Sequence, residues 1–338
     1  MVSIIKKLIN KPEDVVREML EGMALAFPDI IRLDQQWNNV YRRYRKPSYK
    51  VALVCGGGSG HEPAQAGYVG YGMLDAVAAG HVFTAPPAPQ VFAAINEVAS
   101  EAGVFVIITN YTGDVMNFGI AIKMASAKGI KVDHIIVNDD VAISEVSKRR
   151  GTTITILINK IAGAAAEEGW SIEEVKRVAQ KVLSNGRDIG VALTPCVLPT
   201  TGKPTFELAY DEIEFGIGVH GEAGVRRLRY VPSKELAKMM VDAVVDDLKL
   251  QKGDEVALVV QGTGGTPYME KFLFYRDVRL YVESLGLKVF TSWIGEFFTS
   301  LDMQGARVAI LKLDEELKRL LVAPAYTIAI RTPGVVVS

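Results

Sequence analysis

The hydrophobic positions of the chain follow two periods, one typical of helices and one typical of buried strands. Residues 12–27 carry apolar side chains at helical spacing with acidic residues early, which predicts an amphipathic helix. Residues 51–54 and 104–109 are unbroken apolar runs, as in strands buried on both faces of a parallel sheet. Because strands and helices alternate along most of the chain, the pattern predicts α/β layers with sheets between helices.

The rest of the chain continues this alternation and shows no internal repeat. Residues 152–168 fit both a strand and a helix, and we favour a helix from about Thr155. Ser171 and Glu174 form a capping box at the start of another helix. Residues 194–203 are rich in proline, threonine and glycine, which is typical of a linker. The sequence therefore predicts two α/β domains, 1–193 and 194–338. Further strands are expected at 132–137, 189–193, 255–260, 287–291 and 306–313, and further helices at 90–101 and 233–248.

Four glycines crowd the loop after the strand 51–54: Gly56, Gly57, Gly58 and Gly60, followed by His61. Glycine serves where φ is positive or where something approaches the backbone closely. At the end of a buried strand in an α/β protein, that something is usually a ligand. The loop lacks the Lys and Ser/Thr of a P-loop and the third glycine of the dinucleotide fingerprint. It predicts a cradle for something smaller than a nucleotide, with a plain loop as the alternative.

Composition excludes some classes of function. The chain has 338 residues, with 38 Lys and Arg against 39 Asp and Glu, so it carries no basic footprint for nucleic acid. The basic, aromatic residues 41–50 favour a solvated loop over an interaction patch. Cys55 and Cys196 are expected to be buried, inert thiols. No apolar stretch approaches the ~18 residues of a membrane span and the N-terminus is unlike a signal peptide, so we expect a soluble cytoplasmic protein.

The four histidines differ in their surroundings. His61 and His220 lie in glycine-rich turns after apolar segments, where a titratable imidazole favours a functional site. His134 lies within an apolar strand and is assigned a structural role, whereas the role of His81, beside Gly80, is left open.

Asp114 closes the turn 110–114 (NYTGD) after the strand 104–109. Two roles stay open for Asp114: a helix cap, and a site residue at the crevice that the strand ends share. A metal site is not expected, because no Cys/His cluster has ligand spacing. The pairs Asp139–Asp140 and Asp246–Asp247 are assigned as solvated or capping residues.

Several sequence blocks together resemble the K subunit of dihydroxyacetone kinases, the ketose-binding half of an enzyme of glycerol metabolism. The resemblance runs from residue 7 to about residue 324 in the family's order. The blocks are GGGSGHEP (56–63), FTAPPAP (83–89), NYTGDVMNF (110–118), GKPTFELAYDEIEFGIGVHGEAG (202–224), GGTP (264–267) and TSLDMQG (299–305).

The resemblance implies a homodimer and a two-step chemistry. His220 would add through a ring nitrogen to the ketone of dihydroxyacetone, which gives a covalent hemiaminal. His61 and Asp114 would help to deprotonate the terminal hydroxyl as it attacks a phosphoryl group. Besides His61 and Asp114, the positions that would line the substrate are Gly58, Ser59 and Gly60.

The resemblance also implies that this chain binds no nucleotide itself. ADP or ATP with Mg would be held by a separate L subunit, recharged from phosphoenolpyruvate through a phosphotransferase protein or used directly as ATP. Two alternatives stay open: a non-catalytic, ketose-sensing paralogue that acts as coactivator of a regulator, and a kinase subunit for another short ketose. If the resemblance is set aside, the remaining hypothesis is an α/β protein that binds a sugar or a nucleotide.

The chain departs from the family's usual pattern near the expected substrate. Thr109 stands where a lysine is usual, Ala85 replaces a serine, and Gln90 replaces an acid. His81 stands where a glutamate is usual, and residues 143–151 are about three residues shorter. Loss of a cation and a hydroxyl should reshape triose recognition, whereas the capturing histidine is intact.

Overall fold

The computed structural model describes residues 6–333, which form two compact units. The first contains the residues up to Glu13, Asn138–Ile154 and Asn185–Asp314. The second contains Asp14–Val137, Thr155–Ser184 and the residues from Glu315 onward. Both are of α/β type, but the predicted boundary after residue 193 does not coincide with them. The chain passes between the units several times, so that helical segments far apart in the sequence belong to one unit.

The second unit is built on a six-stranded sheet that is parallel at its centre. Strand β3 runs parallel to β5 and β6, and β6 runs parallel to β7, while β2 adds an antiparallel edge next to β5. The order is β1 (Ile31–Leu33), β2 (Asn39–Arg42), β5 (Ala76–Val82), β3 (Ala52–Ser59), β6 (Val104–Thr109) and β7 (Val132–Val137).

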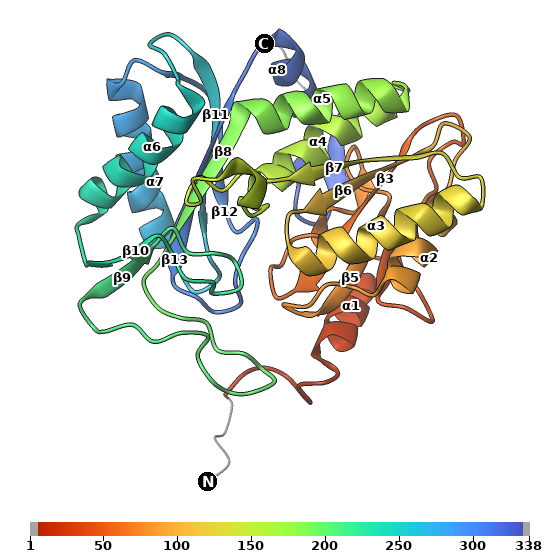
Figure 1. Ribbon diagram of the computed structural model, residues 1–338, viewed down its shortest axis with the longest axis horizontal. Helices are drawn as coiled ribbons and strands as arrows, with labels where there is room; N and C mark the ends of the chain where they lie inside the picture. The colour runs from red at the N-terminus through yellow and green to blue at the C-terminus, as the bar shows by residue number, and fades with distance from the viewer. Residues whose placement is uncertain (1–5, 334–338) are drawn as a thin grey trace. The chain divides into compact units, whose positions relative to one another are not determined.

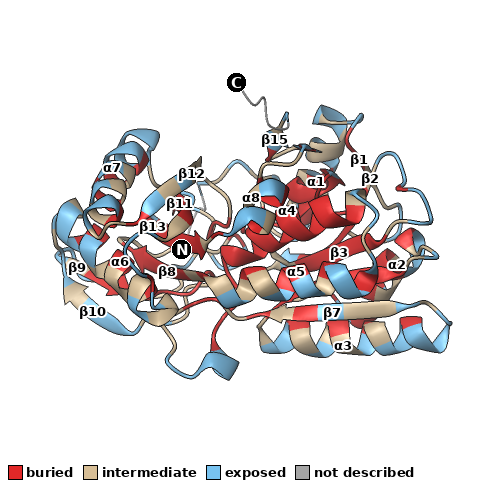
Figure 2. Cartoon of the chain, turned by 90° about the horizontal axis from the view of Figure 1, so that it is seen from above, coloured by how far each residue is buried: buried red, intermediate tan, exposed pale blue. Residues whose placement is uncertain are grey.

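Helices cover this sheet. Helices α2 (Ala88–Val98) and α3 (Thr112–Ala127) share one core cluster with alternate residues of the central strands (Figure 1). Helix α4 (Ile154–Glu167) is buried along nearly its whole length, whereas α3 keeps an exposed outer side (Figure 2). The helix expected from Thr155 is thus confirmed. The other helices of this unit are α1 (Val15–Ala26), α5 (Ile172–Asn185) and α8 (Glu315–Leu321).

The first unit has a second six-stranded sheet, which is mainly antiparallel. Only β11 and β12 pair in parallel, while β13 is antiparallel to both β8 and β11. Helices α6 (Ser233–Leu248) and α7 (Tyr268–Ser284) contribute to one hydrophobic cluster with the central strands. The order is β10 (Arg226–Arg229), β9 (Glu212–Phe215), β8 (Gly186–Ala192), β13 (Gly305–Lys312), β11 (Glu255–Gly262) and β12 (Lys288–Gly295).

The basic, aromatic stretch 41–50 is only partly the solvated loop that its composition favours. Tyr41 lies in β2 with 2% of its surface exposed. Lys46 is also buried, because its ammonium pairs with the Asp75 carboxylate at 2.8 Å. Composition alone could not show that an acidic partner 29 positions away pulls this lysine inside.

The capping box at the start of α5 is confirmed in detail. The Ser171 hydroxyl accepts a hydrogen bond from the Glu174 backbone N–H at 3.3 Å, and the Glu174 carboxylate accepts one from the Ser171 backbone N–H at 3.0 Å. Two N–H groups at the helix start are thereby satisfied reciprocally.

We expect Ser171→Ala to lower the free energy of unfolding by about 1 kcal/mol, because it removes this cap. Urea unfolding monitored by circular dichroism measures the change. Ser126→Ala, at an exposed position within α3, serves as control and should change stability much less. Equal losses in the two variants would contradict the capping assignment.

Candidate active-site elements

Of the glycines expected in a loop after the strand 51–54, all but Gly60 lie in β3 itself, which extends to Ser59, and their surroundings are first of all other parts of the protein. A Cβ on Gly56 would lie 2.4 Å from the carbonyl oxygen of Ala78, and one on Gly58 would lie 2.7 Å from the backbone nitrogen of Thr84. These two glycines are therefore required by neighbouring backbone, as the plain-loop alternative allows. Gly57 differs, because the open side of its Cα faces polar side chains.

Those side chains are Thr109 and Asp114. A Cβ on Gly57, whose φ is +141°, would lie 3.7 Å from a carboxylate oxygen of Asp114 and 3.9 Å from the hydroxyl of Thr109. Thr109 ends β6, and its hydroxyl donates to Asp114 Oδ2 at 3.1 Å. Both residues are buried. The structure thus brings the carboxylate after β6 to the glycine-rich end of β3.

Asp114 does not act as the cap of α3. The N-cap residue is Tyr111, and Asp114 lies within the first helical turn with 5% of its surface exposed. A carboxylate there is favoured by the helix dipole. Asp114 is thus not the N-cap residue itself, and its place beside Gly57 is compatible with the site alternative, which stays a prediction.

His61 is buried at the end of the same loop. Its ring stacks on Phe83, with the centroids 5.0 Å apart and an angle of 14° between the planes. Next to it, the Ser59 hydroxyl donates to the carbonyl of Gly80 at 2.8 Å, which fixes the loop against β5. The imidazole is therefore held in one orientation by an aromatic face.

Glu62 is a residue that the sequence analysis did not single out. Both of its carboxylate oxygens accept from the backbone N–H of Gly60, at 3.0 and 3.1 Å. Burial raises the pKa of Glu62, although this hydrogen bond acts in the opposite direction. The carboxyl group thus fixes the backbone between Ser59 and His61.

The proline-stiffened turn packs against the start of α3. Gly113 is the residue before Asp114, and a Cβ on it would lie 3.0 Å from Cβ of Ala85. Gln90, which stands where the family usually has an acid, donates from its amide to the carbonyl of Ala79 at 2.9 Å. Gln90 is buried and serves the internal hydrogen bonding of β5.

In the first unit, His220 lies in the loop 216–225, which connects β9 and β10. The carboxylate of Glu222 forms a hydrogen bond with the ring Nδ1 of His220 at 2.8 Å. It also accepts a hydrogen bond from the backbone N–H of His220 at 2.9 Å. Burial raises the pKa of Glu222, but the hydrogen bond and the charge attraction from His220 outweigh burial and bring it to about 2. The ring keeps 21% of its side-chain surface exposed.

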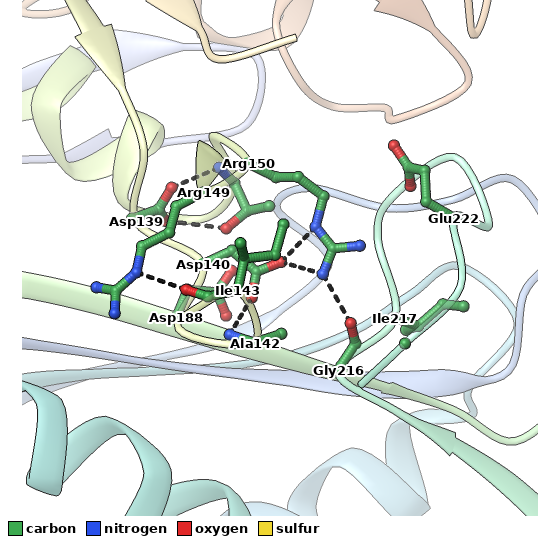
Figure 3. Close-up of polar contacts among 12 residues, drawn as sticks. Asp139, Asp140, Ala142, Ile143, Arg149, Arg150, Asp188, Gly216, Ile217 and Glu222 are labelled. Atoms are coloured by element: carbon green, nitrogen blue, oxygen red, sulfur yellow. Dashed lines mark hydrogen bonds and ion pairs between the residues drawn. The ribbon is translucent and has the colours of Figure 1, made fainter. Parts of the chain in front are cut away.

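Two buried arginines anchor the backbone that leads into this loop, and Figure 3 shows the contact that Arg150 makes with Gly216. Arg150 donates to the carbonyl of Gly216 at 2.7 Å, and Arg307 donates to the carbonyl of Ile217 at 3.1 Å. Arg150 also pairs with Asp140, and Arg307 pairs with Asp188 at 2.8 Å. The sequence analysis missed both arginines; the only local signal for Arg150 is the pair Arg149–Arg150.

The assignment of Asp139 and Asp140 as solvated or capping residues needs correction. Both are fully buried. Asp139 does cap, since it accepts from the backbone N–H of Thr152 and of Ile154 at the start of α4. Burial and the negative charge of Asp188 raise the pKa of Asp139 to about 7. Asp140 instead belongs to the ion pair that holds Arg150.

Both cysteines are buried, as expected. Burial raises the pKa of the Cys55 thiol to about 12, so it carries no thiolate at neutral pH. Within residues 6–333, no three His, Cys, Asp or Glu side chains are arranged so that they could hold a metal ion. No helix in the described part of the chain combines the length and the apolar character that crossing a membrane requires.

Comparison with known proteins places the chain in a family. The profile of the Dak1 domain matches residues 21–329. The chain belongs to the Dak1 family. It is 44% identical to the dihydroxyacetone-binding subunit DhaK of PTS-dependent dihydroxyacetone kinase 1 from Listeria innocua, over 96% of this chain and 99% of the relative.

Solved structures agree with this membership. The dihydroxyacetone kinase of C. freundii superposes with a TM-score of 0.90 at 31% identity, covering 99% of this chain and 62% of that one. A dihydroxyacetone kinase operon co-activator, DhaQ, superposes with a TM-score of 0.89 at 36% identity, covering 95% and 98%. The Dak1 fold is therefore found both in a kinase and in a co-activator.

Of the three predicted catalytic residues, His61 and Asp114 belong to the second unit of this Dak1 chain and His220 belongs to the first. Within the second unit, the structure joins Asp114 to the glycine loop that carries His61. Within the first, it gives His220 a carboxylate partner. The cooperation of all three residues stays a prediction.

We expect Gly58→Ala to lower the free energy of unfolding by about 1–3 kcal/mol, because its methyl group would press on the backbone of Thr84. Gly119→Ala, inside α3 with nothing within 4 Å of its Cβ, is the control and should raise stability by about 0.5–1 kcal/mol. Urea midpoints of both variants measure the changes. A neutral Gly58→Ala would contradict the tight packing of the loop.

Proposed function

We propose that this chain is the dihydroxyacetone-binding, catalytic subunit of a dihydroxyacetone kinase. The observation that carries the proposal is the hydrogen bonding of Glu222 to both the ring Nδ1 and the backbone N–H of His220. The relationship to DhaK over almost the full length of both chains supports the same substrate. The proposal extends to a homodimer that works in the cytoplasm with a separate L subunit.

The geometry of His220 suits it to capture a ketone. The carboxylate of Glu222 next to Nδ1 favours the tautomer that carries its proton there, which places the ring's lone pair on Nε2. Nε2 forms a bond to the carbonyl carbon while the C=O π bond breaks. The resulting alkoxide takes a proton, the imidazolium loses one, and the product is a neutral hemiaminal. Glycerol has no carbonyl group and is therefore rejected.

The second step transfers a phosphoryl group to the terminal hydroxyl of the captured triose. Asp114, with His61, accepts the proton of that hydroxyl as it attacks. Backbone of Gly58, Ser59 and Gly60 lines the triose. The phosphoryl group would come from ATP held with Mg on the L subunit, leaving ADP. Phosphoenolpyruvate would phosphorylate the bound ADP again through a phosphotransferase protein, or fresh ATP would replace it. The PTS-dependent naming of the Listeria innocua relative supports the first route.

Intact mass spectrometry with dihydroxyacetone tests the capture step. We expect the unaltered protein to gain the mass of one triose and His220→Ala to gain none, because only the imidazole at position 220 forms the bond. His134→Ala, at an exposed position on β7, is the matched control and should still gain the triose. An adduct on His220→Ala would refute His220 as the capturing residue.

A coupled assay with an L subunit and a phosphoryl donor tests the transfer step. Asp114→Asn should lower kcat by ~10²–10⁴-fold, the usual worth of general-base help, while the triose adduct still forms. Thr109→Val should lower kcat by roughly tenfold or more, because a hydrogen bond to a charged group is worth about 1.5–3 kcal/mol. The exposed Thr112, changed to Val, is the control. Unchanged turnover in Asp114→Asn would refute the proposed base.

A second candidate function is that of a ketose sensor without turnover. The full-length superposition on the DhaQ co-activator supports it, as does the replacement of the usual lysine by Thr109. In the same assay, a sensor would form the adduct but give no phosphorylated product with any L subunit or donor. Product formation decides for the kinase subunit, for dihydroxyacetone or for another short ketose.

A further inference from the structure

The loop that carries His220 has little regular structure to hold it. Gly216 and Gly221 both have φ near +80°, so the backbone turns sharply on each side of the histidine. Such a segment cannot pair all its carbonyls in a sheet, and buried backbone carbonyls need donors. For the carbonyls of Gly216 and Ile217, the donors are the guanidinium groups of Arg150 and Arg307.

We propose that Arg150 is a positioning residue for the capturing imidazole, an inference that rests on the proposed function of His220. Arg150 is bound on one side to Asp140, through Nε at 2.8 Å and Nη2 at 2.7 Å. Its Nη2 reaches the carbonyl of Gly216 from there. One rigid, planar side chain thus connects a buried carboxylate to the start of the loop.

The same guanidinium also lies beside the carboxylate that grips His220. A Cβ on Gly218 would lie 1.9 Å from Glu222 Oε2 and 2.6 Å from Arg150 Nη1. The two groups therefore occupy neighbouring positions over the Cα of Gly218, which has no room for a side chain. Figure 3 shows Arg150 between Asp140 and the loop, with Glu222 beyond it. A cation there favours the ionised form of Glu222, which the double grip on His220 requires.

The second arginine fixes the frame to the sheet. Arg307 lies on β13 and Asp188 on the neighbouring strand β8, and both are essentially inaccessible to solvent. Their pairing ties the carbonyl of Ile217 to the central strands. The sheet thus fixes the ion pairs, and the arginines of these pairs fix the loop backbone. The loop backbone in turn places Glu222 and the ring of His220.

A purely stabilising role accounts poorly for this cluster. Burying ion pairs costs desolvation, and replacement by apolar side chains is often neutral or favourable for stability. What such a network provides is one defined backbone position. Covalent capture needs that definition, since a reacting atom displaced by about 1 Å can cost about 10²-fold in rate.

The chain offers a matched control in the adjacent residue. Arg149 is also largely buried and pairs with Asp247 at 2.5 Å, and it donates to the carbonyl of Ile143 at 2.9 Å. Neither of these two partners lies within residues 216–222. Arg149→Gln and Arg150→Gln therefore remove the same group from adjacent positions. The partner of Arg149 is 23% exposed and is also bound by Arg187, whereas the partner of Arg150 is fully buried. Only Arg150→Gln removes the donor to Gly216.

The test measures the dihydroxyacetone concentration that gives half-maximal triose adduct in the full-length protein. We expect Arg150→Gln to raise it about tenfold or more and Arg149→Gln to leave it within about twofold of the unaltered protein. Arg150→Lys should fall between them, because one ammonium cannot serve Asp140 and Gly216 with the same planar geometry. Equal adduct curves for Arg149→Gln and Arg150→Gln would overturn the proposal.

A double variant separates positioning from stability. Asp140→Leu with Arg150→Met removes both charges of this pair, and Arg307, which also lies 3.7 Å from Asp140, keeps Asp188 as its partner. We therefore expect the double variant to fold with a smaller loss of thermal stability than Arg150→Gln, which leaves Asp140 without that cation. Its capture should nevertheless stay as weak as that of Arg150→Gln. Restored capture in this stable double variant would show that Arg150 acts only through stability.

A readout without triose keeps this inference separate from the proposed function. The side-chain ¹H–¹⁵N resonances of His220, assigned by their loss in His220→Ala, report the ring's surroundings directly. We expect them to shift in Arg150→Gln and to stay in place in Arg149→Gln. If the unaltered protein forms no adduct, the proposed function fails, while unchanged His220 resonances in Arg150→Gln refute the positioning role.

Discussion

The buried pairing of Asp140 with Arg150 and of Asp188 with Arg307 is the interaction on which the first unit's candidate site depends. The two arginines donate hydrogen bonds to backbone carbonyls that lead to His220, and the two aspartates hold the arginines in place. Their low exposure makes each charge dependent on its partner, because an unpaired charge in such surroundings is very costly. The loop is therefore held by hydrogen bonds from charged groups in addition to the burial of its apolar side chains Ile217 and Val219.

In the second unit, close backbone contacts position the candidate site residues. Gly56 and Gly58 let the glycine-rich end of β3 lie against Ala78 and Thr84 of the neighbouring segments. That packing brings the open side of Gly57 to Asp114, whose carboxylate the Thr109 hydroxyl orients. A crowded glycine loop can thus serve a ligand and the protein's own packing at the same time.

Much of the fold and part of the site could be predicted from local patterns. The capping box of Ser171 and Glu174, the helix from Thr155 and the buried strand Val104–Thr109 all follow from residue type and spacing. The domain boundary could not be predicted, because residues 138–154 and 185–193 join the unit that holds the later strands, while α8 returns to the unit begun much earlier in the chain. Hydrophobic periodicity identifies an element and its buried face, but not the sheet on which that face packs.

The sequence by itself determined which residues carry candidate chemistry: His61, Asp114 and His220, each at a polar or glycine-rich turn after an apolar segment. Only the tertiary structure decided what holds them. Thr109 is five positions from Asp114, but Arg150 and Arg307 are 66 and 90 positions from the carbonyls they bind. Ion pairs and hydrogen bonds of this kind depend on distance in space, which folding creates between residues that no local pattern connects.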